Sequence, residues 1–280
     1  MTRKEFIVSA AAPLAAAAQP ADAKVQRKNR LKQGVCPGVF GRNMPFEERV
    51  RHAARLGAHC FDLQGPQNWP IIKKYGLVPT VVPGGGRLTD GCNDKALHEK
   101  ILAEFRENIP RARKEGVPNV ITFSGNRRGK SDEEGLENCY LVLKEAVKIA
   151  EDNEVTIVME LLNSKVDHKD YQCDHTAWGV ELCKRVNSPR FKLLYDIYHM
   201  QIMEGDVIRT IRSNIQYIGH MHTAGNPGRH QFDDTQELNY RGIAQAIVDA
   251  GYTGYLSHEY SPTTPDPVKT LDEMMTICDV

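Results

Sequence analysis

The chain has 280 residues, a length that suits one α/β barrel of about 250 residues with an extension. Lysine plus arginine and aspartate plus glutamate each number 36, so the formal net charge is zero. This balance gives no electrostatic reason to expect a nucleic-acid or acidic-membrane partner. The seven cysteines form no C-x-x-C pair, which favours buried free thiols over a disulfide framework or a thiolate zinc site.

The first 30 residues resemble an export signal. Thr2-Arg3-Lys4-Glu5-Phe6 gives a charged start, an alanine-rich apolar run follows, and Ala21-Asp22-Ala23 offers small residues for cleavage. The start is similar to a twin-arginine signal with lysine as its second basic residue. We therefore expect residues 1–30 to be an export signal and a disordered segment, which implies a periplasmic location. If the segment is only an alanine-rich tail, the location is cytoplasmic. No later segment is apolar enough to span a membrane.

Short apolar runs rich in Val, Ile, Leu and Tyr alternate with amphipathic stretches through residues 31–280. The runs are typical of parallel strands buried on both faces. The predicted strands are 32–38, 59–64, 78–83, 119–125, 156–163, 191–199, 217–224 and 254–261. The predicted helices are 45–56, 68–75, 96–114, 133–153, 176–186, 207–215, 240–250 and 267–277, with 68–75 the least regular.

Eight strand–helix units predict a single (β/α)₈ TIM barrel as the catalytic domain, residues 31–280. An open doubly wound sheet has the same alternation. However, no G-x-G-x-x-G follows the first strand, so a dinucleotide-binding fold lacks its main support. Gly84-Gly85-Gly86 has no adjoining phosphate-loop lysine, and we interpret it as a flexible loop.

The last four predicted strands each carry a carboxylate or imidazole near the carboxyl end, where TIM barrels place their active sites. These residues are Glu160, Asp196, His222 and Glu259. Charged groups in apolar runs are costly unless they are paired or bind a metal, and no lysine or arginine follows Lys192 in those runs. The mixed oxygen and nitrogen set favours one divalent ion, Mn²⁺, Mg²⁺ or Co²⁺, with Zn²⁺ also compatible. The alternative is a set of core polar residues that satisfy one another.

Strand alternation selects among the neighbouring histidines. His220 and His222 share a face, and His222 lies nearer the functional end, so we expect His222 to be the ligand and His220 to support or pack. His258 points away from the face of Glu259 and is left out. His199 follows Asp196 by three residues, and we expect it to contact substrate.

Three further residues are candidate substrate contacts, each with a structural alternative. Arg229 suits a substrate carboxylate or hydroxyl, or is a surface arginine. Asn126 follows the fourth strand and is placed to hydrogen-bond substrate, whereas the neighbouring Arg127 and Arg128 are equally well explained as solvated side chains. Trp69 either walls the pocket after the second strand or packs in the core.

Two segments, YDIYHMQIMEGD at 195–206 and GNPGR at 225–229, resemble the hydroxypyruvate isomerase family. That family belongs to the xylose-isomerase-like superfamily, which also contains ketose 3-epimerases and endonuclease IV. The resemblance implies that Glu160 and Glu259 are paired acid/base groups that also touch the metal, with Asp196 and His222 completing the ligands. The fourth ligand position is occupied here by His222, where the resemblance leads us to expect glutamine in hydroxypyruvate isomerases and histidine in ketose epimerases. Leu161 also replaces an expected proline.

The function implied by this resemblance is metal-dependent aldose–ketose isomerisation, hydroxypyruvate to tartronate semialdehyde, through an enediolate. The alternatives are a ketose 3-epimerase or isomerase of another free or oxidised sugar, an endonuclease-IV-like phosphodiesterase, and a sugar-binding barrel without turnover. The expected partner is a small hydroxycarbonyl or sugar substrate, and a homo-oligomer is compatible with the sequence.

Overall fold

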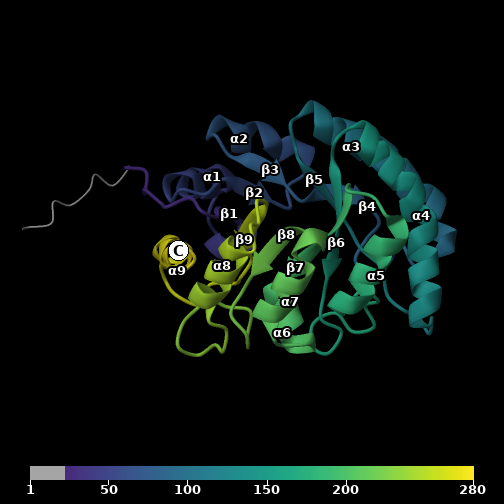
Figure 1. The fold of residues 1–280 in the computed structure, drawn as a ribbon. Helices are drawn as coiled ribbons and strands as arrows, with labels where there is room; N and C mark the ends of the chain where they lie inside the picture. The colour runs from purple at the N-terminus through teal and green to yellow at the C-terminus, as the bar shows by residue number, and fades with distance from the viewer. Residues whose placement is uncertain (1–22) are drawn as a thin grey trace, which may run out of the picture.

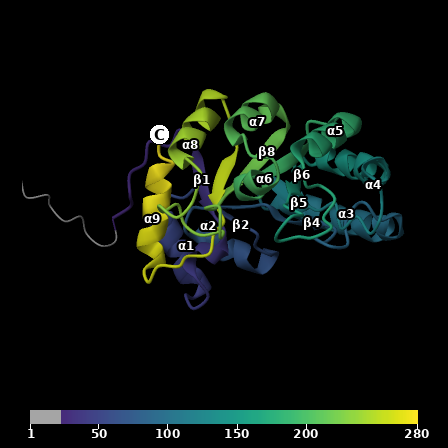
Figure 2. The same cartoon turned by 90° about the horizontal axis from the view of Figure 1, so that it is seen from below.

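A computed structural model describes residues 23–280 of the chain, so residues 1–22 of the predicted export signal and N-terminal segment (1–30) lie outside the described residues. Parallel strands form a nearly closed barrel with the helices on its outer side (Figures 1 and 2). The strand order is β3-β2-β1-β9-β8-β7-β6-β5-β4, and all adjacent strands in this order are parallel. The predicted (β/α)₈ barrel is confirmed.

The strands are β1 (Lys32–Val35), β2 (Cys60–Asp62), β3 (Val78–Thr80), β4 (Val82–Gly85), β5 (Asn119–Thr122), β6 (Thr156–Leu161), β7 (Phe191–Asp196), β8 (Ile218–Thr223) and β9 (Tyr255–His258). The α-helices are α1 (Phe46–Arg55), α2 (Trp69–Lys74), α3 (His98–Lys114), α4 (Asp132–Asp152), α5 (Thr176–Val186), α6 (Ile197–Met203), α7 (Val207–Asn214), α8 (Tyr240–Asp249) and α9 (Pro267–Ile277).

The third predicted strand is divided into β3 and β4 at Val81, whose φ is +49°. β3 pairs with β2 and β4 pairs with β5, so one bent run of chain links the two ends of the sheet. Gly84 and Gly85 belong to β4, and their assignment to a flexible loop was wrong. A Cβ on Gly85 would lie 2.9 Å from the Ile101 carbonyl of α3, so glycine permits this close packing.

The sixth predicted strand, 191–199, was too long. β7 ends at Asp196 and the chain turns directly into α6, a helix that the sequence analysis missed. The Asp196 side chain caps α6 by accepting hydrogen bonds from the backbone N–H of Tyr198 (2.8 Å) and His199 (3.4 Å). The largely apolar run continues across this boundary, and periodicity does not separate a buried strand from a short buried helix.

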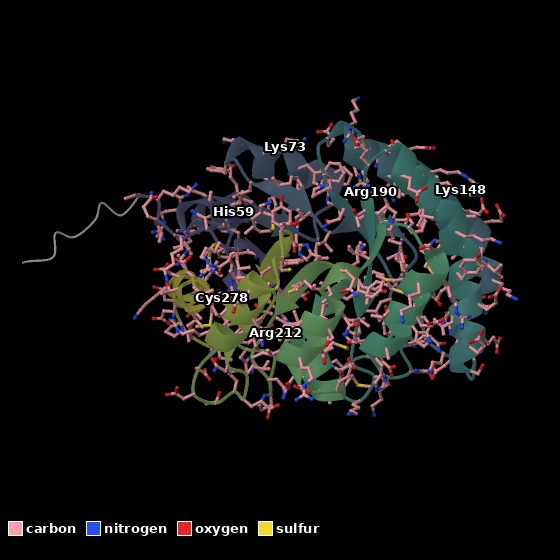
Figure 3. All side chains as sticks on the ribbon, viewed as in Figure 1. His59, Lys73, Lys148, Arg190, Arg212 and Cys278 are labelled. Atoms are coloured by element: carbon pink, nitrogen blue, oxygen red, sulfur yellow. The ribbon has the colours of Figure 1, made fainter. Side chains whose placement is uncertain are left out.

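Apolar side chains fill two regions. The larger core lies between the strands and the surrounding helices. A second cluster consists of Val81, Ile121, Val158 and Leu194. Side chains alternate between the two faces of a strand, and Ile157, next to Val158, belongs to the larger core outside the barrel. The second cluster therefore lies inside the barrel. Charged side chains cover the outer helix surfaces, among them Lys73, Lys148 and Arg212 (Figure 3).

Residues 23–30 lie against the first and last helices of the barrel. The Val25 N–H donates to the Arg55 carbonyl at 2.8 Å, and the Arg27 guanidinium contacts the Leu56 carbonyl (2.9 Å) and Asp272 of α9 (2.5 Å). The contacts of the barrel therefore begin before residue 31. Among the helices of residues 23–280, none is both long and apolar enough to cross a membrane.

Candidate active site

The carboxyl ends of β6 to β9 bring the four predicted ligands together. Glu160 lies in β6, Asp196 ends β7, His222 lies in β8 and Glu259 directly follows β9. Asp196 and His222 are paired in register across β7 and β8, and each of the four offers a ligand atom within 4.8 Å of the others. The strand ends thus build one compact group of three carboxylates and one imidazole.

Several polar atoms of this site are buried without a hydrogen-bond partner. They include Asp196 Oδ2, His222 Nδ1 and His199 Nε2. His222 Nδ1 lies 2.9 Å from Glu259 Oε2 and 3.7 Å from Glu160 Oε1, but in neither case with hydrogen-bond geometry. Unpartnered buried polar atoms are rare in folded proteins and call for an explanation such as an ion. Because the donor set also matches the preferences of hard and borderline divalent ions, the residues present fit a metal.

Burial shifts the pKa values of the three carboxylates, and their neighbours modify the shifts. Burial, together with the charge of Glu259, raises the pKa of Asp196 to about 6 even though Arg229 opposes the shift. The pKa of Glu160 is raised by burial and by the charge of Glu259. Burial would also raise the pKa of Glu259, but His222 and Arg229 outweigh it and hold that pKa at about 2. A bound cation would offset the free-energy cost of keeping these buried carboxylates ionised.

Arg229 is brought into the site by the loop that follows β8. Its Nη2 lies 2.9 Å from Glu259 Oε2 and 3.6 Å from Asp196 Oδ2, and its guanidinium packs over the Tyr198 ring at 5.5 Å. Arg229 is therefore not a surface arginine. Its charge faces two carboxylates of the site, and substrate contact stays a prediction.

His199 lies in the first turn of α6, not in a strand, and its ring still faces the site. Asn163 Nδ2 lies 2.6 Å from His199 Nδ1, and His199 Nε2 is 3.6 Å from Asp196 Oδ2. Burial, and then the charge of Arg229, holds the pKa of His199 well below its ordinary value. A neutral ring that accepts from Asn163 at Nδ1 carries its proton on Nε2, where it is available to a substrate oxygen.

The other two predicted contacts are placed differently. Trp69 is buried in the main core, where its indole N–H donates to the Gln64 carbonyl at 2.9 Å, and these are the contacts of a packing residue. Asn126 is half-buried after β5, and its backbone N–H donates to the Thr89 carbonyl at 3.1 Å. Substrate binding by either residue stays a prediction.

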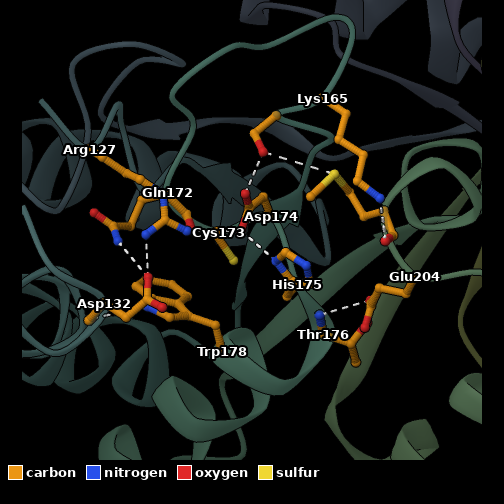
Figure 4. Close-up of polar contacts among 12 residues, drawn as sticks. Arg127, Asp132, Lys165, Gln172, Cys173, Asp174, His175, Thr176, Trp178 and Glu204 are labelled. Atoms are coloured by element: carbon orange, nitrogen blue, oxygen red, sulfur yellow. Dashed lines mark hydrogen bonds and ion pairs between the residues drawn. The ribbon is translucent and has the colours of Figure 1, made fainter. Parts of the chain in front are cut away.

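Arg127 has a structural explanation that the sequence did not reveal. Its guanidinium pairs with Asp132 and lies 3.1 Å from Asp174 in the loop after β6 (Figure 4). Asp174 also accepts from Ser164 Oγ at 2.5 Å and lies 2.8 Å from His175 Nδ1. This network joins the loop after β5 to the loop after β6, and both loops border the carboxyl ends of the strands.

Two residues near the site were missed. His168, in the loop after β6, packs edge-on to the His199 ring at a centroid distance of 5.2 Å, and no strand-end pattern marks it in the sequence. Asp62 ends β2 in the apolar run C-F-D-L and is buried beneath His222. The strand-end pattern that selected the four ligands also applies to Asp62, so that signal was present.

The fold is a parallel β/α barrel, and its strand ends gather three carboxylates and one imidazole. These features are typical of barrels whose site suits metal-assisted chemistry on small molecules. Residues 69–278 match the model of the xylose isomerase-like TIM barrel family, and the chain belongs to that family.

Similar curated proteins carry isomerase names. A 2-oxo-tetronate isomerase of Cupriavidus necator is 33% identical over 165 residues, which cover 57% of this chain and 63% of that protein. The hydroxypyruvate isomerase of Escherichia coli is 36% identical over 107 residues, covering 37% and 41%. Each match therefore spans less than two thirds of the relative.

Solved structures share the fold. A family 2 AP endonuclease from Brucella melitensis aligns with a TM-score of 0.76 and 24% identity, covering 88% of this chain and 98% of that one. A D-psicose 3-epimerase from Clostridium cellulolyticum, solved with D-tagatose, aligns with a TM-score of 0.69 and 19% identity, covering 89% and 94%. At these identities the likeness shows the fold alone.

Proposed function

We propose that this protein is a metal-dependent isomerase of the aldose–ketose type that acts on a small hydroxycarbonyl substrate. The observation that carries the proposal is the group of Glu160, Asp196, His222 and Glu259, whose ligand atoms lie within 4.8 Å of one another. Two of these residues have buried atoms without a hydrogen-bond partner, Asp196 Oδ2 and His222 Nδ1. Such a set is expected where a divalent ion and a substrate oxygen complete the contacts.

The four residues would hold one divalent ion, which when bound would polarise a substrate carbonyl and stabilise negative charge on the neighbouring oxygens. Isomerisation requires a proton to leave one carbon and return to its neighbour. Glu160 and Glu259 come from β6 and the end of β9, so two carboxylates approach the substrate position from separate strands. We assign them the proton transfers as general base and general acid. The Nε2–H of His199 and the guanidinium of Arg229 would donate to substrate oxygens.

The substrate class favoured by the curated relatives is a short 2-oxo acid that bears a hydroxyl, as in hydroxypyruvate and 2-oxo-tetronate. Arg229 is a cation of this site suited to such an anion. A second candidate is a ketose 3-epimerase, which His222 as the nitrogen ligand favours. Both reactions use the same two-carboxylate proton transfer, and they differ in the carbon that receives the proton.

Solvent deuterium incorporation tests the proposal. The Mn²⁺-loaded protein is incubated in D₂O with hydroxypyruvate, 2-oxo-tetronate and a ketose panel, and the products are identified by NMR. Glu160→Gln and Glu259→Gln should each reduce exchange at least about 10²-fold because each removes a positioned acid/base group. The matched control is Glu204→Gln, since Glu204 accepts from Thr176 N–H at 2.9 Å and caps α5 rather than lining the site. Exchange at the wild-type rate in either site variant, or full activity after chelation, would refute the assignment.

We also propose that the protein is exported and that cleavage leaves the described barrel intact. The support is the position of Val25 and Arg27, which hold the chain to α1 and α9 just after the small residues at 21–23. Amino-terminal sequencing of the protein from fractionated cells tests this, and an uncleaved chain in the cytoplasmic fraction would contradict it.

A further inference from the structure

A fully buried carboxylate lies beneath the predicted ligand group. Asp62, at the end of β2, has no solvent exposure, and its Oδ2 lies 2.7 Å from His220 Nε2 and 3.2 Å from His222 Nε2. The Thr80 hydroxyl of β3 donates to the other oxygen of Asp62. One carboxylate thus receives contacts from β3 and from two histidines of β8, across the interior of the barrel.

The two ring nitrogens of His222 face different surroundings. Nε2 faces Asp62, with Cys36 Sγ at 3.8 Å, whereas Nδ1 faces Glu259 and Glu160 and has no hydrogen-bond partner. Because an ionised carboxylate only accepts hydrogen bonds, the contact with Asp62 requires the proton on Nε2. The lone pair of a neutral ring is then on Nδ1, which faces Glu160 and Glu259.

His220 holds Asp62 from the other side. Its Nε2 lies closer to Asp62 Oδ2 than the His222 nitrogen does, and the two histidine rings meet edge to face at 5.2 Å. Cys36, Asp62 and His222 also form a compact group of potential metal ligands. However, burial raises the pKa of the Cys36 thiol, and the oxygens of Asp62 already face three donors. The geometry of Asp62 therefore suits support of His222 better than a second ion.

We infer that Asp62 is a positioning residue that fixes the ring orientation and the protonated nitrogen of His222, with His220 and Thr80 holding Asp62 in place. The inference rests on the proposed metal-dependent function, because it concerns how His222 presents Nδ1. Hydrogen-bonded partners behind a ligand histidine typically change metal affinity by about 10–100-fold when they are removed.

Metal affinity measured without substrate gives the first test. Mn²⁺ dissociation constants are determined by titration calorimetry for the wild type, Asp62→Asn and Asp62→Ala. We expect Mn²⁺ binding to weaken about 10–100-fold in each variant. The matched control is Gln33→Ala, which removes a buried partner 2.9 Å from Nε2 of His258, a histidine outside the ligand group. This control should lose stability and keep the wild-type Mn²⁺ affinity.

The second test needs only the wild-type protein, so it decides the question even if the Asp62 variants do not fold. Two-bond ¹H–¹⁵N spectra of histidine-labelled, Zn²⁺-loaded protein report which nitrogen of His222 carries the proton. A proton on Nε2 supports the inference, and a proton on Nδ1 overturns it. Unchanged Mn²⁺ affinity in folded Asp62→Asn and Asp62→Ala also overturns it, while leaving the metal site intact. A wild-type protein that binds neither Mn²⁺ nor Zn²⁺ overturns the metal site and this inference together.

Discussion

The two oxygens of Asp196 have different surroundings, which lets one substitution separate stability from metal binding. Oδ1 caps α6, whereas Oδ2 is buried without a hydrogen-bond partner, 3.6 Å from Arg229 Nη2. Asp196→Asn retains an oxygen for the cap, since asparagine and aspartate cap helices about equally well. The substitution removes the charged oxygen that faces the other ligands.

The size of the effect follows from the pKa of Asp196, which burial and the charge of Glu259 raise from 3.8 to about 6. One pKa unit corresponds to about 1.4 kcal/mol, so the ionised carboxylate costs the metal-free fold about 3 kcal/mol at neutral pH. The folded-state pKa lies above the unfolded one. The cost is therefore full above pH 6, shrinks as the pH falls from 6 to 3.8, and vanishes below that range.

We predict that metal-free Asp196→Asn is more stable than the wild type at pH 7.5, by up to about 3 kcal/mol, and that the difference disappears near pH 4. Its affinity for Mn²⁺ should fall at least about 10-fold. Urea unfolding in EDTA at both pH values, together with Mn²⁺ titration, measures these effects. Asp196→Ala is the control and should be about 1 kcal/mol less stable than Asp196→Asn because it lacks the cap. A less stable Asp196→Asn at pH 7.5, or unchanged Mn²⁺ affinity, would refute the reasoning.

Two further predictions concern the barrel itself. Burial, and then the charge of Arg27, lowers the pKa of His258 from 6.5 to about 3. Between these pH values the unfolded chain binds a proton at His258 that the folded protein does not. The free energy of unfolding should therefore fall by about 1.4 kcal/mol per pH unit as the pH drops from 6.5 towards 3. His258→Gln should remove that slope in urea unfolding between pH 4 and 6, and parallel curves would contradict the assignment. A Cβ on Gly34 would lie 2.1 Å from Cys60 Sγ and 2.4 Å from Ser257 Oγ, so Gly34→Ala should cost about 1–3 kcal/mol or more. Thermal unfolding checks this, and Cys60→Ala in the same chain should recover part of the loss.

The order and position of the barrel elements could be predicted because each buried parallel strand is a short apolar run and each covering helix has an apolar stripe. The element ends could not. Nothing in the run V-P-T-V-V-P marks the break at Val81, whose left-handed backbone is unusual for a β-branched residue. The predicted strand around Asp196 likewise ran past the true boundary, because the chain turns into α6 directly after Asp196, and this turn brings His199 to the site.

The four candidate ligands could be predicted because consecutive strand ends of a parallel barrel meet at one mouth. The same rule, applied to every strand, would have included Asp62. Asp62 was left out because only the last four strands were searched for ligands. The candidate taken from the region after the second strand was Trp69, which packs in the core. Strand-end position is therefore informative around the whole barrel, including the residues that lie one layer below the mouth.

The positions of the predicted strands do not indicate which positively charged side chain lies beside the carboxylates of the site. Counting basic residues only within the strands left the carboxylates without a neighbouring cation, but the loop after β8 brings Arg229 to 2.9 Å from Glu259 and 3.6 Å from Asp196. This contact depends on how a loop folds back, which no local pattern specifies. Arg229 therefore offsets part of the negative charge of the three carboxylates, and His222, 2.9 Å from Glu259, offsets more of it when its ring is protonated. The candidate site thus combines carboxylates at strand ends, which the sequence predicts, with a loop arginine whose position depends on the fold of the loop after β8.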